Sequence, residues 1–175
     1  MSSQIIGGGS GVADSSERIG REGTHTPEVI ERAVVFRLDA QRYGIPIDRV
    51  NEIQQIVAFS DVPADGLGVV GMINLRGVVI PAIDVRQLVG IESRAYTLET
   101  PMIIARSGEH VVALIVDGVE DVIALPEGCL QAASPMQPLS SKMLGVCRLD
   151  DGLVYLLDVD RLLAQGHLGE ESDDA

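Results

Sequence analysis

The sequence predicts an all-β fold made of two related small barrels. The apolar residues are mostly Val, Ile and Leu, while aromatics make up 3% of the chain. Because Val and Ile are stiff at χ1, this composition favours strands over helices. Short apolar runs alternate with turns that contain Gly or Pro. An internal repeat then indicates that the folded part consists of two similar units.

The repeat relates two halves of the chain position by position. Residues 71–75 (GMINL) are echoed by 145–149 (GVCRL), and 84–88 (DVRQL) by 158–162 (DVDRL), both with a shift of 74. Upstream, the pattern of Ile45 to Glu52 recurs from Leu114 to Asp121 with a shift of 69. Two copies are too few for a solenoid, whereas short strands that close on themselves protect their edges.

The elements of the first copy follow in order. Strands are expected at residues 34–38, 43–47, 52–58, 69–75 and 78–83. Between and after them we expect a helical turn at 48–50, a loop at 63–68 and a short helix at 85–88. Arg76-Gly77 joins the last two strands tightly, because glycine permits the positive φ of such a turn.

The chain divides into three parts. Residues 1–32 lack periodicity and contain GGGSG at 7–11, so they are predicted to be a disordered tail. Residues 33–163 form the folded part, with barrels at about 33–90 and 100–163, and exchange of strands between the barrels is left open. Residues 164–175 are a solvated acidic tail.

The charge excludes two classes of partner. The formal net charge is −13, and phosphate binding needs a basic surface, so we expect no nucleic acid. Anionic membrane surfaces are excluded for the same reason. We see no signal peptide and no apolar window of the roughly 20 residues that a membrane span needs, so a cytoplasmic protein without membrane insertion is expected.

Arg76 and Glu52 are the charged residues with a candidate binding role. Arg76 follows an alternating strand at a glycine turn, where it is either a solvated surface group or a contact displayed for a partner. Glu52 lies between Val50 and Ile53 and is either an outward residue without a role, a residue facing Arg76, or a carboxylate offered to a partner.

Four aspartates follow apolar strands: Asp48, Asp84, Asp117 and Asp158. An enzyme would gather them into a metal or acid–base site. The favoured interpretation is that each caps a short helix by accepting a backbone N–H. An Asp-dependent enzyme and a small-ligand-binding barrel remain as alternatives to a binding protein.

Other catalytic and metal-binding patterns are missing from the sequence. The three histidines follow no zinc spacing, and there is no Gly-x-Ser-x-Gly elbow. Cys129 and Cys147 have no metal-ligand spacing and are interpreted as reduced, buried residues. We therefore predict no catalytic residues, no metal and no cofactor.

Residues from about Ala33 to Leu163 resemble the CheW family and the homologous regulatory domain of the CheA kinase. Six blocks, taken in order, carry the resemblance: FRL at 36–38, YGIPI at 43–47, VNEI at 50–53, GMINLRG at 71–77, VVIPAID at 78–84 and VDGVEDV at 116–122. The order and spacing of the blocks are specific, whereas any block alone is not.

The resemblance implies two intertwined five-stranded SH3-like barrels and a non-enzymatic coupling role. The implied partners are the cytoplasmic tip of a methyl-accepting chemoreceptor and the regulatory domain of a CheA-type histidine kinase, in an array beneath the inner membrane. By motif match, the receptor-binding region would contain Val50, Glu52, Gly71, Asn74, Arg76 and Gly77. The other barrel would contribute Met102 and Val122 to further partner contacts. The long N-terminal tail leaves open which chemosensory pathway is served.

Overall fold

The computed structural model describes residues 30–57, 60–61 and 68–164 of the chain. The tails predicted at 1–32 and 164–175 lie outside the described residues, except for positions 30–32 and 164. Both tails therefore stay predictions. Arg32 already belongs to the first strand.

The first repeat copy contains six strands and two short helical segments. They are β1 (Arg32–Leu38), β2 (Gln41–Pro46), the 3-10 turn η1 (Ile47–Arg49), β3 (Val50–Gln55), β4 (Ser60–Asp61), β5 (Val69–Leu75), β6 (Val78–Asp84) and α1 (Val85–Leu88). The expected strand at 69–75 and the expected helix at 85–88 match β5 and α1. The strand expected at 52–58 begins earlier, at Val50, and ends at Gln55.

The second copy repeats the order of six strands and a final helix, but its 3-10 turn follows the fourth strand rather than the second. Its elements are β7 (Pro101–Ser107), β8 (His110–Ile115), β9 (Gly118–Ala124), β10 (Leu130–Gln131), the 3-10 turn η2 (Ser140–Lys142), β11 (Met143–Leu149), β12 (Gly152–Leu157) and α2 (Val159–Leu163). Strands dominate and the helices are short, which confirms the all-β class. Across residues 30–57, 60–61 and 68–164, none of the helices has the length and apolar character to cross a bilayer.

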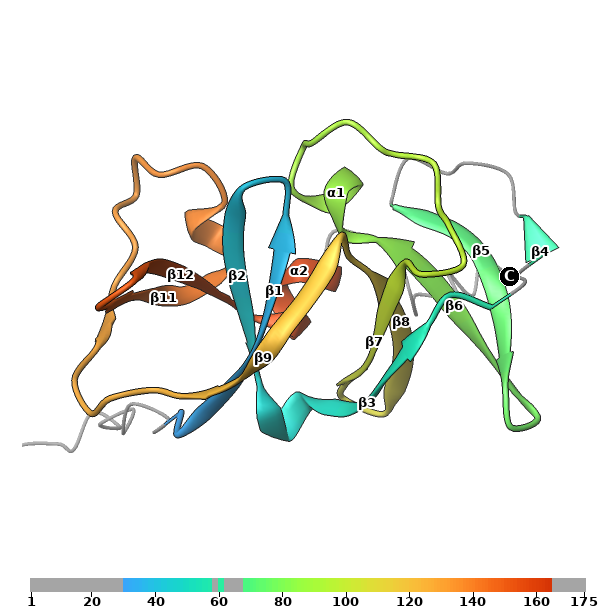
Figure 1. Ribbon diagram of the computed structural model, residues 1–175, viewed down its shortest axis with the longest axis horizontal. Helices are drawn as coiled ribbons and strands as arrows, with labels where there is room; N and C mark the ends of the chain where they lie inside the picture. Colours follow the sequence, from blue (N-terminus) through green and yellow to red (C-terminus); the bar gives the residue numbers. More distant parts are fainter. Residues whose placement is uncertain (1–29, 58–59, 62–67, 165–175) are drawn as a thin grey trace, which may run out of the picture.

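The strands form two sheets, which lie on the right and the left of Figure 1. The first sheet has the order β3-β7-β8-β6-β5-β4, and the second has β10-β11-β12-β2-β1-β9. We call them the first barrel and the second barrel. Each has five strands of six or seven residues, as expected of an SH3-like barrel, plus one two-residue strand. Each sheet also takes one hairpin from the other copy: β7–β8 joins the first sheet and β1–β2 the second.

Three apolar clusters make up the core. One lies within the first barrel and includes Met102 and Ile104, and another lies within the second barrel and includes Val35 and Leu156. The largest cluster takes buried residues from both barrels, from Phe36 to Leu163. The exchanged strands serve two clusters at once, because successive side chains of a strand point to opposite faces.

The β5–β6 connection is a two-residue turn with positive φ at both positions. Arg76 has φ 50° and Gly77 has φ 85°, as a type I′ hairpin requires. The Gly77 amide donates to Asn74 Oδ1 at 2.8 Å, which holds the turn. The expectation of positive φ at Gly77 is thereby confirmed.

Candidate functional site

The end of the β5–β6 hairpin is an exposed tip, which we call the first tip (residues 74–79). Arg76 is 72% exposed, and the aliphatic residues Val78 and Val79 beside it are 60% and 61% exposed. Asn74 lies opposite Val79 in the strand register. An exposed cation next to solvent-exposed aliphatics is a typical composition for a docking surface.

Glu52 on β3 holds Arg76 against the other end of the first sheet. Arg76 Nη2 donates to Glu52 Oε2 at 2.7 Å, and Gln54 Nε2 donates to Glu52 Oε1 at 2.7 Å. The facing of Glu52 and Arg76, one of the alternatives from the sequence, is therefore observed. Because Arg76 is mostly exposed, this pair contributes at most about 1 kcal/mol, so the guanidinium can still engage a partner.

The β11–β12 hairpin carries an equivalent tip on the second barrel, the second tip (residues 148–153). Asp151 Oδ1 accepts from Arg42 Nη1 at 3.1 Å, and Arg42 Nε donates to Glu120 Oε2 at 2.8 Å. Partial burial of Arg42 acts to lower its pKa, but the bonds to Asp151 and Glu120 raise it above its ordinary value. Arg42 thus connects the second tip to the end strand β9, because it binds both Asp151 and Glu120.

The two tips differ in charge. The first tip carries Arg76 alone, whereas the second carries Arg148 together with Asp150 and Asp151, of which Asp151 is 71% exposed. Both tips expose an aliphatic residue at the same register position, Val79 and Leu153. Equivalent register positions of the two barrels therefore present surfaces of opposite net charge.

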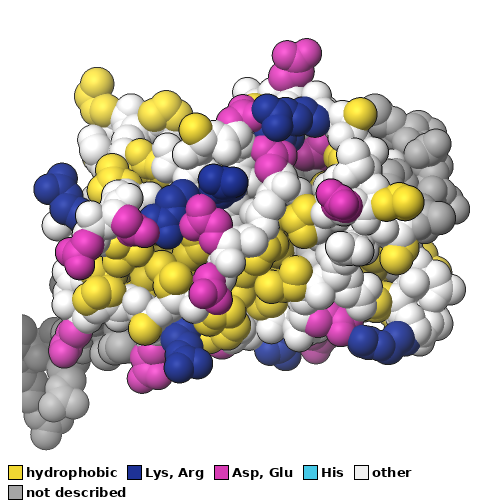
Figure 2. Space-filling view, in the orientation of Figure 1, with side chains coloured by type: hydrophobic (Ala, Val, Ile, Leu, Met, Phe, Trp, Pro, Cys, Tyr) yellow, Lys and Arg dark blue, Asp and Glu magenta, His cyan; other side chains and the backbone are white. Residues whose placement is uncertain are grey.

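The predicted contact residues Val122, Val50 and Met102 differ in how accessible their side chains are. Val122 is 40% exposed on β9 of the second barrel, where Figure 2 shows hydrophobic side chains edged by acidic and basic ones. Val50 is half-buried where β3 begins. Met102 has no exposed surface, so it packs in the core and offers no side chain to a partner.

The placement of Met102 in the barrel opposite Arg76 is wrong. Its strand, β7, pairs with β3 and β8 in the first sheet, on the same barrel as Arg76. The reason is the hairpin exchange, by which the second copy contributes its first two strands to the first barrel.

Gly71 is buried and opposes Asp61 of the short strand β4. The equivalent glycine of the second barrel shows why this position is small. A Cβ at Gly145 would lie 2.5 Å from the backbone oxygen of Gln131 in β10. Gly71 therefore belongs to a strand contact, and its predicted role at a partner interface stays a prediction.

The aspartates divide into caps and non-caps. Asp84 accepts the Arg86 amide and Asp158 accepts the amides of Asp160 and Arg161, so these two cap α1 and α2 as predicted. The cap interpretation is wrong for the other two. Asp48 lies inside η1, after the cap residue Pro46. Asp117 is followed by strand β9, not by a helix.

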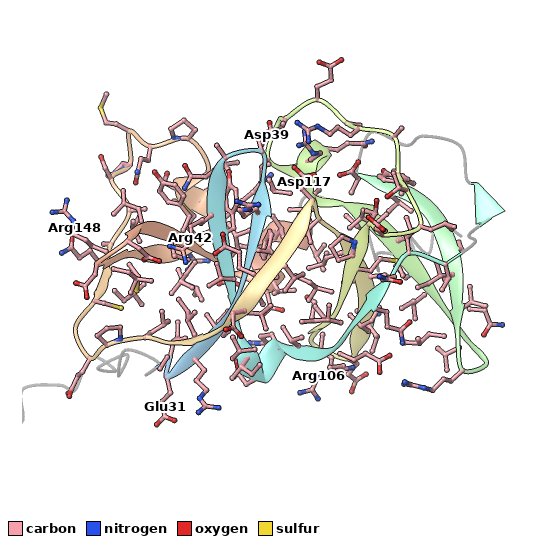
Figure 3. The ribbon with its side chains drawn as sticks, in the orientation of Figure 1. Glu31, Asp39, Arg42, Arg106, Asp117 and Arg148 are labelled. Carbon is pink, nitrogen blue, oxygen red and sulfur yellow. The ribbon has the colours of Figure 1, made fainter. Side chains whose placement is uncertain are left out.

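Asp117 instead binds Arg86, which is 4% exposed. Arg86 Nε donates to Asp117 Oδ1 at 2.6 Å, its Nη2 also contacts Asp39, and its Nη1 donates to the Glu92 carbonyl at 2.7 Å. Asp39 and Asp117 lie side by side next to α1 in Figure 3, and the Asp39 amide donates to Asp117 at 2.7 Å.

The pKa values follow from this geometry. Burial alone would raise the pKa of Asp117, but the hydrogen bonds from Arg86 and from the Asp39 amide outweigh it and lower the pKa. The hydrogen bonds that Arg86 donates to the carboxylates of Asp117 and Asp39 raise the pKa of Arg86 despite its desolvation. In the second barrel, burial and then the neighbouring Cys129 raise the pKa of the Cys147 thiol to about 12.

This geometry gives little support to the two alternatives, an enzyme and a ligand-binding barrel. In the part of the chain that the structure describes, no group of three or more His, Cys, Asp or Glu could hold a metal ion. Two cavities, beside Tyr96 and beside Tyr155, have volumes of about 160 Å³ each. Small-molecule pockets are usually roughly 300–1,000 Å³.

Sequence reasoning missed the second tip and the buried Arg86. The second tip was within reach, because the shift of 74 carries the β5–β6 turn onto Asp150 and Asp151. Arg86 gave no such signal, since its partner Asp39 stands 47 positions away and Asp117 stands 31 away.

A family model described as a CheW-like domain matches residues 32–167. The chain is 32% identical over 136 residues to the chemotaxis protein CheW of Klebsiella aerogenes, covering 75% of this chain and 80% of that protein. It is 26% identical over 130 residues to CheW of Thermotoga maritima, covering 74% and 85% of the two chains.

A solved structure is similar as well. The scaffolding protein TtCheW from Thermoanaerobacter tengcongensis superposes with a TM-score of 0.69 and 29% sequence identity. The match covers 75% of this chain and 86% of that one.

Proposed function

The chain belongs to the CheW-like family, and from this premise we propose that it is a non-enzymatic scaffold that couples methyl-accepting chemoreceptors to a CheA-type histidine kinase. The observation that carries the proposal is the pair of tips described above. They are exposed, lie on different barrels and differ in charge. A coupling protein needs two separate docking surfaces, and this arrangement supplies them.

The first barrel is the proposed receptor site. Asn74, Arg76 and Gly77 belong to the first tip and Glu52 contacts it, while Val50 begins β3 and Gly71 lies in β5 of the same barrel. Exposed aliphatics would supply buried area against a helical receptor tip, while Arg76 and Glu52 would fix the register. Arg is a frequent hot-spot residue because its planar fork binds carboxylates and carbonyls at several points.

The second barrel is the proposed kinase site. Val122 on β9 and the second tip give an exposed aliphatic surface with two carboxylates. The kinase's regulatory domain would dock here as a protein of related fold. Each interface would be modest in area, so strength would come from many copies in an array at the inner membrane. The scaffold itself is proposed to be cytoplasmic and to bind no cofactor.

The proposal is tested by calorimetry with two partners from the same organism, a receptor cytoplasmic fragment and the kinase regulatory domain. Arg76→Glu is expected to weaken receptor binding by about 2 kcal/mol or more, roughly thirtyfold in Kd. Kinase binding is expected to stay within twofold of the parent. The fold should remain intact, because Arg76 lies at an exposed turn.

Arg148→Glu is the matched control, since it makes the same charge change on the tip of the other barrel. It should leave receptor binding unchanged. Receptor affinity that falls equally in both variants would point to a general charge effect. Unchanged receptor affinity in Arg76→Glu would remove Arg76 from the interface.

A further inference from the structure

The barrels are joined along a seam that the described chain crosses twice. The η1 turn leads from β2 in the second barrel to β3 in the first, and Val116-Asp117 leads from β8 in the first to β9 in the second. A helix lies beside each crossing: α2 beside η1 and α1 beside Asp117. The two crossings are equivalent in the repeat.

The crossing at Asp117 is held by an ionic cluster around the buried Arg86, whose partners Asp117 and Asp39 are partly exposed. Arg86 of α1 binds Asp117 in the crossing and Asp39 in the β1–β2 turn of the second barrel. Arg94 adds a second cation at 2.8 Å from Asp39. Arg86 therefore connects α1 of the first barrel to the crossing at Asp117 and to the β1–β2 turn of the second barrel.

The equivalent crossing at η1 has weak, exposed contacts instead. Asp160 occupies the position that corresponds to Arg86 after the shift of 74. It lies 3.4 Å from Arg49, with exposed fractions of 49% and 36%, and accepts a bond from Ser107 Oγ at 2.8 Å. Exposed pairs of this kind contribute little to stability.

The shared apolar cluster attaches the barrels to each other by burying side chains from both. Apolar burial is non-directional and depends on area alone. Charge-assisted bonds from a guanidinium are directional, because the planar fork fits its acceptors in one geometry. At the seam, Arg86 makes side-chain bonds to two residues, Asp39 and Asp117, whereas Lys142 Nζ adds a single bond, to the Leu88 carbonyl at 2.7 Å.

We propose that Arg86 is a positioning residue that fixes the orientation of one barrel relative to the other. Its cluster with Asp39 and Asp117 holds the two tips at a set angle, while the crossing at Asp160 contributes little. The consequence for signalling rests on the proposed coupling function: the angle between the docking surfaces decides whether receptor and kinase can be engaged in one arrangement.

Double electron–electron resonance on the full chain tests this directly. Spin labels are attached at V79C on β6 and R148C on β11, both exposed, in a background with Cys129→Ser. Cys147 is fully buried and is left in place. The parent is expected to give one narrow distance distribution. Arg86→Lys keeps the charge but loses the fork, and should at least double the width of the distribution or shift its maximum.

Asp160→Asn is the matched control at the equivalent crossing and should keep the parental distribution. A folded Arg86→Lys with the parental distribution would overturn the positioning role. If Arg86→Lys does not fold, the double variant Arg86→Met/Asp117→Asn removes one charge of each sign and leaves Asp39 with Arg94. A broadened distribution in that variant supports the role, and a parental one refutes it.

The distance measurement needs no partner, so its result stands apart from the coupling function. Failure of the calorimetric test with intact positioning would contradict the proposed function alone. Unfolding by urea is recorded for each variant, because a variant that is merely less stable keeps the parental distance.

Discussion

The two barrels share a backbone plan but close in different ways. In the first, the tip residue Arg76 pairs directly with Glu52 on the end strand β3. In the second, Asp151 reaches the end strand through Arg42, which also binds Glu120. The two copies of the repeat therefore share their strand register and core, whereas the side chains at their tips differ. One chain therefore presents two different ends.

The seam shows the same contrast between its two crossings. The helix that follows the first barrel's strands carries the buried Arg86, and its counterpart carries the exposed Asp160. Burial raises the energetic weight of a charge, because removing one partner leaves the others desolvated and uncompensated. The largest expected effects therefore come from the Arg86 side.

Replacing Arg86 by Ala should have the largest effect on stability of the changes considered at the two crossings. The variant removes the main partner of Asp117, while Asp39 keeps Arg94, and it is expected to lose about 1.5–3 kcal/mol in free energy of unfolding. Asp160→Ala should lose no more than about 0.5 kcal/mol, because its pair with Arg49 is exposed. Urea titrations followed by circular dichroism measure both. Equal losses would show that the crossings are energetically alike.

Met102→Ala and Val122→Ala separate a core residue from a surface residue. Met102 is fully buried in the first barrel, so its truncation should cost about 2–5 kcal/mol. Val122 is 40% exposed on the second barrel, and its truncation should leave stability within about 0.5 kcal/mol. Thermal and urea unfolding provide the values. A stable Met102→Ala variant would contradict its placement in the core.

Acid sensitivity should distinguish Asp117 from its counterpart Asp48. The pKa of Asp117 is lowered in the folded state, so its contribution is present above the unfolded pKa of about 3.9. That contribution is lost as pH falls through the lower folded pKa. Asp117→Asn should lose about 2 kcal/mol at neutral pH and show a flatter decline in stability below about pH 4.

The control for this effect is Asp48→Asn, whose side chain is exposed in η1. Unfolding free energies are measured between neutral pH and the acid range. Parallel curves for the parent and Asp117→Asn would show that Asp117 is not the group responsible.

Gly77→Ala should give a smaller effect than Asp117→Asn. At φ 85° a side chain costs about 1–2 kcal/mol, and no atom lies within 4 Å of the Cβ that Ala would add. Gly77→Ala should therefore lose about 1 kcal/mol, while Gly77→Val should lose more because β-branched residues tolerate positive φ poorly. Urea unfolding of both variants checks the order. A fully stable Gly77→Val would refute the backbone assignment.

Local patterns predicted much of this molecule. Alternating apolar residues located β5 and β6, glycine located the turn, and the Asp-Val pairs located the caps of α1 and α2. These features depend on neighbours in sequence. The alternation of apolar residues predicts which face of a strand is buried, but it does not predict which other strand pairs with it. Local patterns therefore left the exchange of strands open, and the position of Met102 was misassigned.

One signal of the exchange was present in the sequence. The runs at 102–105 and 111–115 are continuously apolar, which is typical of strands buried on both faces. In the structure Met102 and Ile104 face the first barrel's interior, while Ile103 and Ala105 face the shared cluster. The buried Arg86 gave no comparable sign, because a charged residue in a four-residue helix is usually exposed.

The proposed function requires the two barrels to bind the receptor and the kinase at the same time. One measurement tests this directly. The scaffold is mixed with the receptor cytoplasmic fragment and the kinase regulatory domain, and the mass of the complex is measured by sedimentation. We predict a ternary complex that contains all three proteins. Formation of two binary complexes that exclude each other, with no ternary species at saturating concentrations, would contradict the claim.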